Sequence, residues 1–536
     1  MNILKMKITH LFVALSVLFL GVVSCDDKDK HYDPDTSVIS EYTLMDLINQ
    51  NDDLSVFASM IEAIGYDSVL NSSQSYTVWA PVNDALADVD ITDLDQVEEI
   101  VNNHIARFVK SASGAVNERV FMNNTKLLTF KGGSGVYYLE DAQLVSLNTV
   151  GKNGVLHTIN SRVPFFQNIW EYLNTPGLDS IRDYLYSFNK KEFDPSASDE
   201  IDINEEGFTV YDSVFIESNE MWYAYFSSTR GIGWINSEDS IYTMIIPSNQ
   251  AWIEAYDRIF PYFVNNMAQG KDSIQNLNTK YAIVKDLVFR GEVNPNLYGE
   301  ADSLSSTRFG LFYDPQYLFE NAEKIDASNG MIYLQNESLK NKSWESWNPT
   351  IKMEAEFSAA NRQILNPTQV NTGVTGINYY NDAPEISNGG TFYVEAAANN
   401  TNLAPEVTFE IPNTLAGAYD IYCVFAPDIL AKPAAPKMGK VRFEIQQKTR
   451  RGTDNWLPIA SGGGMGGEII PANNVIDTIQ MTKMLVYENF KLPYANYNES
   501  ENTIRLKVIS KLSQGDTNKG FGNRMNIDCI IFEPVH

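Results

Sequence analysis

Hydrophobic residues recur every three or four positions in the first part of the chain, as they do along one face of an α-helix. This spacing predicts helices over 44–48, 54–64 and 97–108, with a polar break over 51–53. Shorter runs rich in β-branched and aromatic residues predict strands over 76–80, 127–130, 136–139 and 155–159. Together these elements predict an α+β domain over residues 41–165.

Two short sequences of this domain recur downstream. YTVWAPVNDAL at 76–86 is followed later by YTMIIPSNQAW at 242–252, and NGVLHTIN at 153–160 by NGMIYLQN at 329–336. In the first copy we expect Trp79 and Val82 in the core, and Asn83 and Asp84 as caps of the following helix. The second copy has Tyr333 where the first has His157. The repeat predicts a second, divergent α+β domain over 166–345.

The second copy carries extra residues before its first repeated sequence. The excess predicts an insertion near 193–240. An alternating run over 208–215 and an aromatic run over 222–226 read as added strands or a hairpin.

The hydrophobic pattern changes near residue 349. From there, short apolar or alternating runs are punctuated by Pro and Gly, without helical periodicity. This pattern predicts an all-β sandwich over 349–536. A chain of 536 residues is in any case too long for one core. Cys423 and Cys529 fall in two candidate strands, where they are either small buried residues or a disulfide.

The N-terminus has the pattern of a secretory leader. Lys5 and Lys7 precede an apolar run over 11–23, which is shorter than a membrane-spanning helix and ends at Val-Val-Ser-Cys25. The polar residues after it, within 25–40, predict a flexible tether. This segment resembles a bacterial lipoprotein signal over 1–24, which implies cleavage before Cys25 and acylation of its sulfur.

Charge and motif content weigh against several functions. The net charge of −28 repels phosphate backbones, so we expect no nucleic-acid partner. His104 and His157 lie within apolar elements and read as structural residues. The sequence has no nucleophile elbow, no phosphate loop and no metal-ligand spacing of His or Cys. We therefore expect a binding protein that requires no cofactor, and not an enzyme.

The repeated sequences resemble the two signature motifs of the fasciclin (FAS1) domain, which implies two FAS1-like domains of sheets flanked by helices. The segments MEAE at 353–356, AGAYDIYCVFAP at 416–427 and NIDCIIFEP at 526–534 resemble strands of the galactose-binding-like jelly roll found in carbohydrate-binding modules. The acidic run after Cys25 resembles the lipoprotein export signal of Bacteroidota, which implies display on the outer face of the outer membrane; it also fits a simple spacer.

These resemblances imply candidate ligand residues in loops. Sugars are held by aromatic faces together with amide and carboxylate groups. The candidates on the sandwich or just before it are Trp344, Trp347, Tyr379, Tyr380, Trp456, Asn523 and Asn526. Glu354 and Glu356 resemble acids that hold a structural calcium in some such modules, and a strand-edge salt bridge fits them equally.

A surface lipoprotein of this build resembles the accessory proteins of SusC/SusD-type outer-membrane importers. The resemblance implies capture of a nutrient ligand, either glycan or peptide, or docking on such an importer. The alternative is an adhesin that binds host matrix or neighbouring cells.

Overall fold

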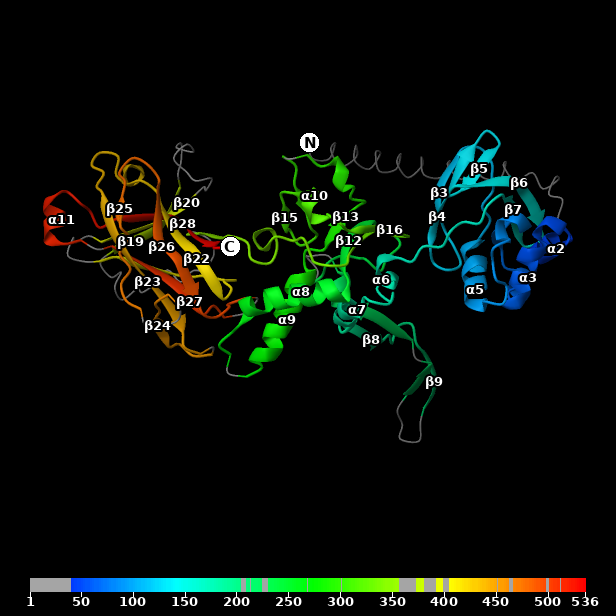
Figure 1. Cartoon of the computed structure of the whole chain (residues 1–536), viewed down its shortest axis with the longest axis horizontal. Helices are drawn as coiled ribbons and strands as arrows, with labels where there is room; N and C mark the ends of the chain where they lie inside the picture. Colours follow the sequence, from blue (N-terminus) through cyan, green and yellow to red (C-terminus); the bar gives the residue numbers. More distant parts are fainter. Residues whose placement is uncertain are drawn as a thin grey trace, which may run out of the picture. The chain divides into compact units, whose positions relative to one another are not determined.

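The computed structural model describes residues 40–536 apart from several gaps. The gaps are 204–208, 213, 224–229, 268, 300, 356–372, 380–391, 399–403, 451, 462–465, 498–500 and 511. The expectations for Cys25, Glu356, Tyr380 and the tether fall outside the described residues. The chain divides into two compact units, Met1–Phe165 and Phe166–His536 (Figure 1).

The first unit contains the predicted α+β elements. Its helices are α2 (Leu44–Asn49), η1 (Asp52–Leu54), α3 (Ser55–Ala63), α4 (Asp67–Leu70), η2 (Asn83–Leu86) and α5 (Leu94–Asn103). Its strands are β1 (Tyr76–Pro81), β2 (Ile105–Arg107), β3 (Val116–Phe121), β4 (Leu127–Gly133), β5 (Val136–Leu139), β6 (Ala142–Gly151) and β7 (Gly154–Ile159). They form one sheet in the order β2-β1-β7-β6-β5-β4-β3, in which β1 and β7 are parallel.

The two repeated sequences form the centre of this sheet. β1 and β7 carry them, and both strands are buried along their whole length. Gly154 opens β7 at φ +151°, and a Cβ there would lie 1.9 Å from the carbonyl oxygen of Tyr76. The Asn-Gly turn is therefore required for close approach of the two strands.

Two local expectations for this unit are wrong. The helix predicted over 97–108 ends at Asn103, because Ile105 instead pairs with Val78 in the sheet. Asn83 does not cap its own helix: its side-chain oxygen accepts a hydrogen bond from the N–H of Val56, at the start of α3, at 2.9 Å. The predicted placement of Trp79 in the core is confirmed.

The second unit begins with a related α+β part. Its helices are α6 (Ile169–Tyr172), α7 (Asp179–Tyr186), α8 (Asn249–Ile259), η4 (Phe260–Phe263), α9 (Lys271–Val284), η5 (Pro295–Leu297) and α10 (Pro315–Leu318). Its main sheet joins β12 (Tyr242–Pro247), β13 (Val288–Arg290), β16 (Glu323–Ala327) and β17 (Gly330–Gln335) in the order β13-β12-β17-β16. This order repeats β2-β1-β7-β6 of the first unit, and β12 and β17 are again parallel.

The same side-chain hydrogen bonds occur in both copies. Asn153 accepts from the N–H of Leu44 at 2.8 Å and donates to two carbonyls just before β1. Asn329 accepts from the N–H of Ile169 at 2.9 Å and donates to two carbonyls just before β12. In each copy, one buried amide therefore ties the first helix to the turn that opens the central strand.

The first part of the predicted insertion forms a β-ladder, but the strand expected for the aromatic run 222–226 is wrong at its start, because Trp222 ends η3 (Glu220–Trp222) and 224–226 lie outside the described residues. β8 (Asn189–Phe193) pairs with β11 (Phe215–Asn219), and β9 (Asp199–Ile203) pairs with β10 (Thr209–Asp212). Figure 1 shows β9 leading away from α7. β8 is exposed along its whole length, so this ladder is an arm rather than part of the core.

The rest of the second unit is a β-sandwich, as the hydrophobic pattern predicts, with two short helices, η7 (Asp428–Leu430) and α11 (Gln514–Asn518), between its strands. One sheet has the order β19-β20-β28-β22-β26, with β18 (Ile351–Glu354) also paired to β28, and the other has the order β21-β27-β23-β24, with β25 paired to β23. The remaining bounds are β19 (Gly373–Tyr379), β20 (Phe392–Ala398), β21 (Glu406–Glu410), β22 (Gly417–Phe425), β23 (Gly439–Lys448), β24 (Trp456–Pro458), β25 (Val475–Ile476), β26 (Thr482–Leu492), β27 (Ile504–Ser510) and β28 (Met525–Pro534). A large apolar core fills the space between the sheets.

The two sandwich cysteines are free thiols. Cys423 belongs to the core between the sheets, whereas Cys529 belongs to a small cluster with Val424 and Ile531. Side chains on opposite faces of one sheet point away from each other, so the disulfide alternative is wrong.

The sandwich shares a core with the α+β part of its unit. Leu415 and Ala495, from two sandwich loops, are buried in the hydrophobic cluster that also contains Phe263 of η4. Backbone hydrogen bonds reinforce this contact, including one of 2.6 Å from the N–H of Ala495 to the carbonyl of Val264.

Candidate functional site

The two α+β parts differ in how one face of the sheet is covered. In the first unit, the segment 108–141 forms β3, β4 and β5, which continue the sheet and cover Trp79 and His157 with an apolar cluster. In the second unit, the segment 291–322 has nearly the same length. It instead forms η5, the short pair β14 (Leu304–Ser305) and β15 (Leu311–Phe312), and α10.

This difference leaves a cleft beside the second sheet. The cleft has a volume of about 1070 Å³ and lies between η5, α10 and the strands β16 and β17. We call it the Tyr333 cleft. Its lining residues are Glu292, Val293, Asn294, Pro295, Asn296, Leu297, Asp314, Gln316, Tyr317, Phe319, Glu320, Lys324, Met331 and Tyr333.

The floor of the Tyr333 cleft is aromatic. Phe319 and Tyr333 are 5% and 6% exposed, and their ring centroids lie 4.6 Å apart in an edge-to-face contact. The hydroxyl of Tyr333 donates to the carbonyl of Val293 at 3.0 Å. Burial raises the pKa of Tyr333, so the phenol stays protonated and keeps this hydrogen bond.

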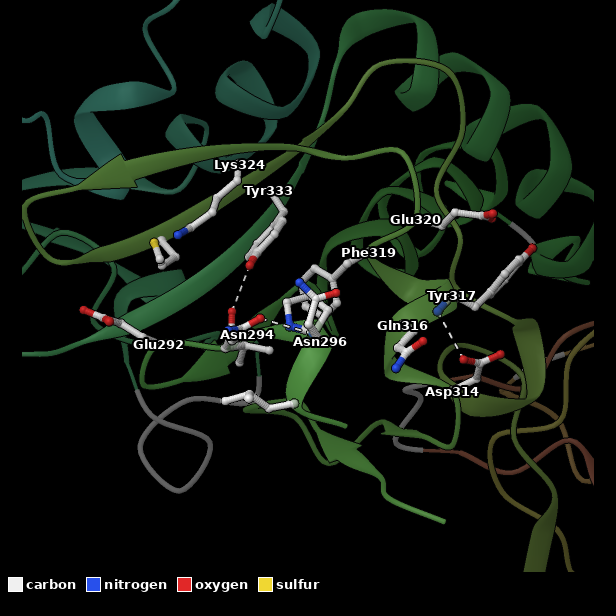
Figure 2. A pocket seen from close by; sticks show the side chains of 14 residues that line it. Glu292, Asn294, Asn296, Asp314, Gln316, Tyr317, Phe319, Glu320, Lys324 and Tyr333 are labelled. Carbon is white, nitrogen blue, oxygen red and sulfur yellow. Dashed lines mark hydrogen bonds between the residues drawn. The ribbon is translucent and has the colours of Figure 1, made fainter. Parts of the chain in front are cut away.

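The rim of the cleft is polar. Figure 2 shows Lys324 and Tyr333 on one side, Gln316 and Tyr317 on another, and Asn296 between them. This rim exposes Asn296, Gln316 and Tyr317 to solvent, with 39% of Tyr317 accessible. An apolar floor with amide, carboxylate and ammonium groups around it suits a ligand that has both an apolar face and hydroxyl groups.

Turn hydrogen bonds hold this rim in place. The Asn294 side chain accepts from the N–H of Asn296 at 3.1 Å, and that of Asp314 accepts from the N–H of Tyr317 at 3.1 Å. Each acceptor is the N-cap of a short helix with proline at its first position. The side chains that face the cleft are therefore carried on two capped turns.

Both buried histidines of the first unit are held by backbone groups. His104 contacts the carbonyl of Ile100 at 2.7 Å and accepts from the N–H of Val163 at 3.0 Å. Burial lowers the pKa of His104 to about 4, and burial also lowers that of His157. Both rings are packed among apolar side chains, which agrees with a structural role.

Two of the expected ligand residues flank the start of the sandwich. Trp344 lies in η6 (Ser343–Glu345), is 46% exposed, and packs on His536 with ring centroids 4.6 Å apart. Trp347 is only 2% exposed and packs against Tyr262 in the shared core. The surface position expected for Trp347 is therefore wrong, because the indole is part of the contact between the sandwich and the α+β part.

The other expected residues are divided between the two sheets. Tyr379 ends β19, and Asn526 lies within β28 and not in a loop. Trp456 begins β24 in the other sheet, where Lys448 and Arg505 lie over its ring at 5.0 and 4.2 Å.

The amides near β28 are largely enclosed. Asn523 and Asn526 are 8% and 2% exposed, and Asn526 donates to the carbonyl of Pro427 at 3.4 Å. The loop position expected for Asn526 is therefore wrong. Burial of this extent favours a structural role for both side chains.

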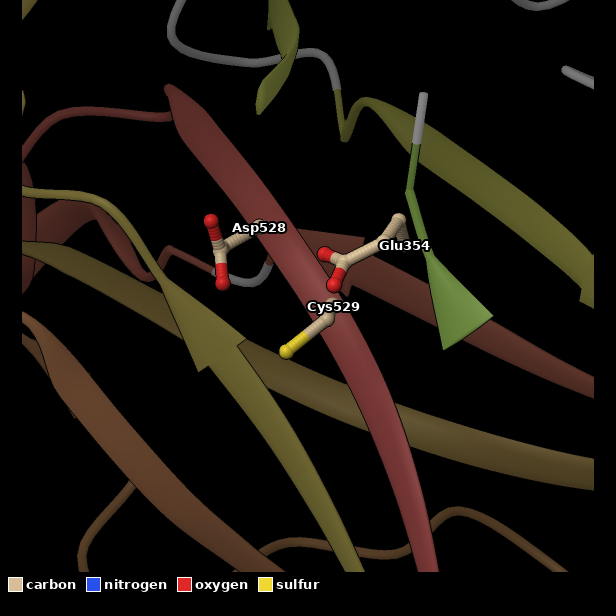
Figure 3. Close-up of side chains that lie close together, drawn as sticks. All are labelled: Glu354, Asp528 and Cys529. Atoms are coloured by element: carbon tan, nitrogen blue, oxygen red, sulfur yellow. The ribbon is translucent and has the colours of Figure 1, made fainter. Parts of the chain in front are cut away.

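The expected calcium ligand Glu354 lies beside Asp528 and Cys529 (Figure 3). One ligand atom from each of these residues lies within 4.8 Å of the others. Calcium takes six to eight oxygen ligands, and these residues supply two carboxylates and a thiol whose pKa burial and Asp528 raise. Glu354 also pairs with Lys352 at 2.7 Å, which is the alternative salt bridge. The described residues therefore fit the salt bridge better than calcium.

The sequence analysis overlooked the residues of the Tyr333 cleft. The signal was present as two similar turns, Asn-Pro-Asn at 294–296 and Asp-Pro-Gln-Tyr at 314–317. Each places proline between polar residues, a pattern that fixes a turn and presents side chains to solvent. Neither turn reveals that both border the same cleft, because this depends on the sheet between them.

Comparison with known proteins supports part of this picture. Residues 52–163 match the family model of the fasciclin domain. Among solved structures, the FAS1 domain pair of the insect cell adhesion molecule Fasciclin I is similar at 14% identity, covering 55% of this chain and 99% of its own, with a TM-score of 0.21. No curated protein matches the chain.

Carbohydrate-active proteins also appear among the similar structures. An exo-β-1,3-galactanase from Phanerochaete chrysosporium, solved with galactose, is 15% identical over 34% of this chain and 29% of its own, with a TM-score of 0.17. A xanthan lyase from Paenibacillus is 17% identical over 31% and 12%, also with a TM-score of 0.17. Scores this low support no argument about fold or ligand.

Among the helices that the structure describes, none has the length and hydropathy needed to cross a membrane. The family match covers the helices and strands from η1 to β7, including both signature sequences. Such domains are typical of adhesion and binding proteins. The chain therefore contains a fasciclin (FAS1) domain, at residues 52–163.

Proposed function

We propose that this protein is a lipid-anchored binding protein of the outer bacterial surface, and not an enzyme, that captures a glycan in the Tyr333 cleft. The cleft is the observation that carries this proposal. In this reading, residues 166–345 are a second, divergent FAS1 domain whose sheet lacks the strands that cover the first. The sandwich is a galactose-binding-like module fused to it.

A glycan fits the cleft for chemical reasons. A pyranose ring has an apolar C–H face and a rim of hydroxyl groups, and the cleft offers aromatic rings beside amides and carboxylates. Tyr317 is the exposed aromatic ring of the rim, with Lys342 at 5.1 Å from its centroid. Asn296 and Gln316 lie near enough to the same cleft to donate or accept hydrogen bonds.

Glycan-array screening followed by calorimetry with the best oligosaccharide tests this proposal. Tyr317→Ala should weaken binding about tenfold, equivalent to about 1.4 kcal/mol. Tyr313→Ala is the matched control, because Tyr313 is 62% exposed and does not line the cleft. The proposal fails if the array is blank, or if both substitutions affect binding equally.

The anchor is supported by the leader pattern that ends at Cys25. Intact-mass analysis of the membrane-purified protein should show an acylated N-terminal cysteine, and Cys25→Ala should release the protein from membranes. Surface proteolysis of whole cells tests exposure. A protein that keeps its leader and carries no acyl group on Cys25 would contradict the proposed anchor, but it would not contradict the proposed glycan binding.

We propose a SusC/SusD-type importer as the docking partner of this protein in nutrient capture. The alternative is adhesion, which the FAS1 domain and the exposed Phe193, Phe215 and Ile216 of the arm favour. Affinity purification from native outer membranes should recover importer subunits in the first case. If no importer genes neighbour this gene, and the purified protein binds extracellular matrix or cells, adhesion is supported instead.

A further inference from the structure

A second hollow lies in the first unit, beside the edge strands β2 and β3 of its sheet. Its volume is about 510 Å³, and we call it the Phe108 hollow. The residues that line it are Arg107, Phe108, Lys110, Arg119, Val120, Phe121, Met122, Asn123 and Thr125. Among these described residues three are cationic and none is acidic. In a chain of net charge −28, such a composition makes this a local basic site.

The strands place cations and aromatic rings side by side. An antiparallel bridge joins Ala106 to Met122, which brings Arg107 of β2 next to Phe121 of β3. Arg119 lies two residues before Phe121 and therefore shares its face of the strand. Arg107, Arg119 and Phe121 are all exposed. Lys110 pairs with Glu118 at 2.8 Å and Arg119 also has an interaction partner, so Arg107 is the guanidinium group on which the site depends.

Phe108 has an unfavourable backbone conformation. Its φ is +69°, a region that L-residues with large side chains rarely adopt, and its side chain is 73% exposed. The equivalent position in the second unit is Gly291, with φ +74°. Both residues directly follow the short strand after the helix, and both carbonyls accept from the equivalent threonine of the central strand, Thr77 or Thr243.

Comparison with Gly291 shows that Phe108 is an unfavourable residue for this backbone conformation. Glycine adopts this conformation without steric cost, whereas phenylalanine adopts it at a cost and gains little burial in return. Residues held in such conformations at the surface are often functional. Here the exposed ring lies at the edge of the hollow that also contains Arg107.

We propose that the Phe108 hollow binds a glycan carrying isolated carboxylate groups, with the ring of Phe108 against a sugar face and Arg107 on the carboxylate. Guanidinium groups form paired hydrogen bonds to carboxylates. Dense polyanions are repelled by the net charge of −28, which favours a sparsely acidic ligand. This site is separate from the Tyr333 cleft and does not depend on the function proposed for it.

Calorimetry on the full chain tests the inference with 3′-sialyllactose and 6′-sialyllactose as carboxylated probes and lactose as the neutral one. At least one carboxylated probe should bind and lactose should bind about tenfold more weakly or not at all. Arg107→Gln should weaken binding about tenfold and reduce its dependence on salt. Absence of binding by both carboxylated probes would overturn the inference.

Phe108→Gly separates binding from folding. The substitution removes the aromatic contact but suits the left-handed backbone, so binding should fall about tenfold while the melting temperature of the first unit does not fall. Phe309→Gly is the matched control, because Phe309 has φ +66°, is 60% exposed and lies in the second unit. Full binding by Phe108→Gly would overturn the proposed contact.

Two further variants distinguish other ligands. Tyr317→Ala, in the Tyr333 cleft, should leave binding of the carboxylated probe unchanged. A glutamate hexapeptide should bind more weakly than the carboxylated glycans. Equal or tighter binding of the peptide would show that the hollow recognises acidic protein segments and would overturn the glycan assignment.

Discussion

Tyr333 in the second unit takes the structural place of His157 in the first. His157 pairs with Trp79 across β1 and β7, and its Nε2 lies 2.9 Å from the carbonyl of Lys110. Tyr333 has the same position in β17, and its hydroxyl donates to the carbonyl of Val293 at 3.0 Å. A side-chain hydrogen bond from the central strand to the chain after the helix is thus kept while the residue type changes.

Removing that hydroxyl should cost stability. In Tyr333→Phe, the carbonyl of Val293 loses its partner, and we expect the free energy of unfolding to fall by about 1 kcal/mol. Urea denaturation of the full chain measures the change. His157→Phe removes two backbone contacts, to the carbonyl of Lys110 and the N–H of Asn148, and should cost about 2 kcal/mol in the first unit. An unchanged midpoint for both variants would mean that these bonds are replaced by water.

The buried amides provide a test of the two-unit organisation. Asn153→Ala and Asn329→Ala each remove three hydrogen bonds to backbone groups and should each cost about 3 kcal/mol. Because the chain divides at Phe165, each variant should shift only the unfolding transition of its own unit, as followed by calorimetry. Movement of both transitions by either variant would contradict separate cooperative units.

Acid should weaken the first unit through His104. Its pKa is about 4 in the folded chain against a usual 6.5. The unfolded chain therefore binds a proton that the folded chain excludes, and stability falls progressively as the pH drops from about 6.5 to about 4. The total loss is about 3 kcal/mol.

The pH dependence can be assigned with one variant. His104→Gln should be less stable than the natural chain at pH 7, since it cannot reproduce both backbone contacts. It should nevertheless lose less stability on acidification. Melting curves of the first unit at a series of pH values measure this difference. Parallel pH profiles for the two proteins would exclude His104 as the source.

The sandwich thiols should be unreactive in the folded protein. Burial raises the pKa of both Cys423 and Cys529, which removes the reactive thiolate. Ellman's reagent should label them only after unfolding, with or without prior reduction. Rapid labelling under native conditions would mean that the sandwich opens locally.

The sequence predicts the centre of each α+β part well, because local signals and tertiary contacts agree there. The strands at 76–80 and 155–159 are apolar on both faces, and both are fully buried in the sheet. β3 was missed because its sequence, VNERVF, interrupts apolar positions with polar ones. The helix predicted through Phe108 was too long because pairing of Ile105 with Val78 overrides helical periodicity.

The site was harder to predict than the fold. The Tyr333 cleft exists because the segment 291–322 does not extend the sheet, and no residue of that segment signals this by itself. Trp347 has the sequence context of a loop and is nonetheless buried by a part of the chain far away in sequence. Exposure of an aromatic residue depends on such distant contacts, which hydrophobic patterns do not reveal.

The burial of Leu415 and Ala495 in the core of the α+β part has a mechanical consequence. A pulling force between the sandwich and the α+β part is carried by a packed apolar contact and not by a single loop. The two parts should therefore resist pulling as one element and rupture together.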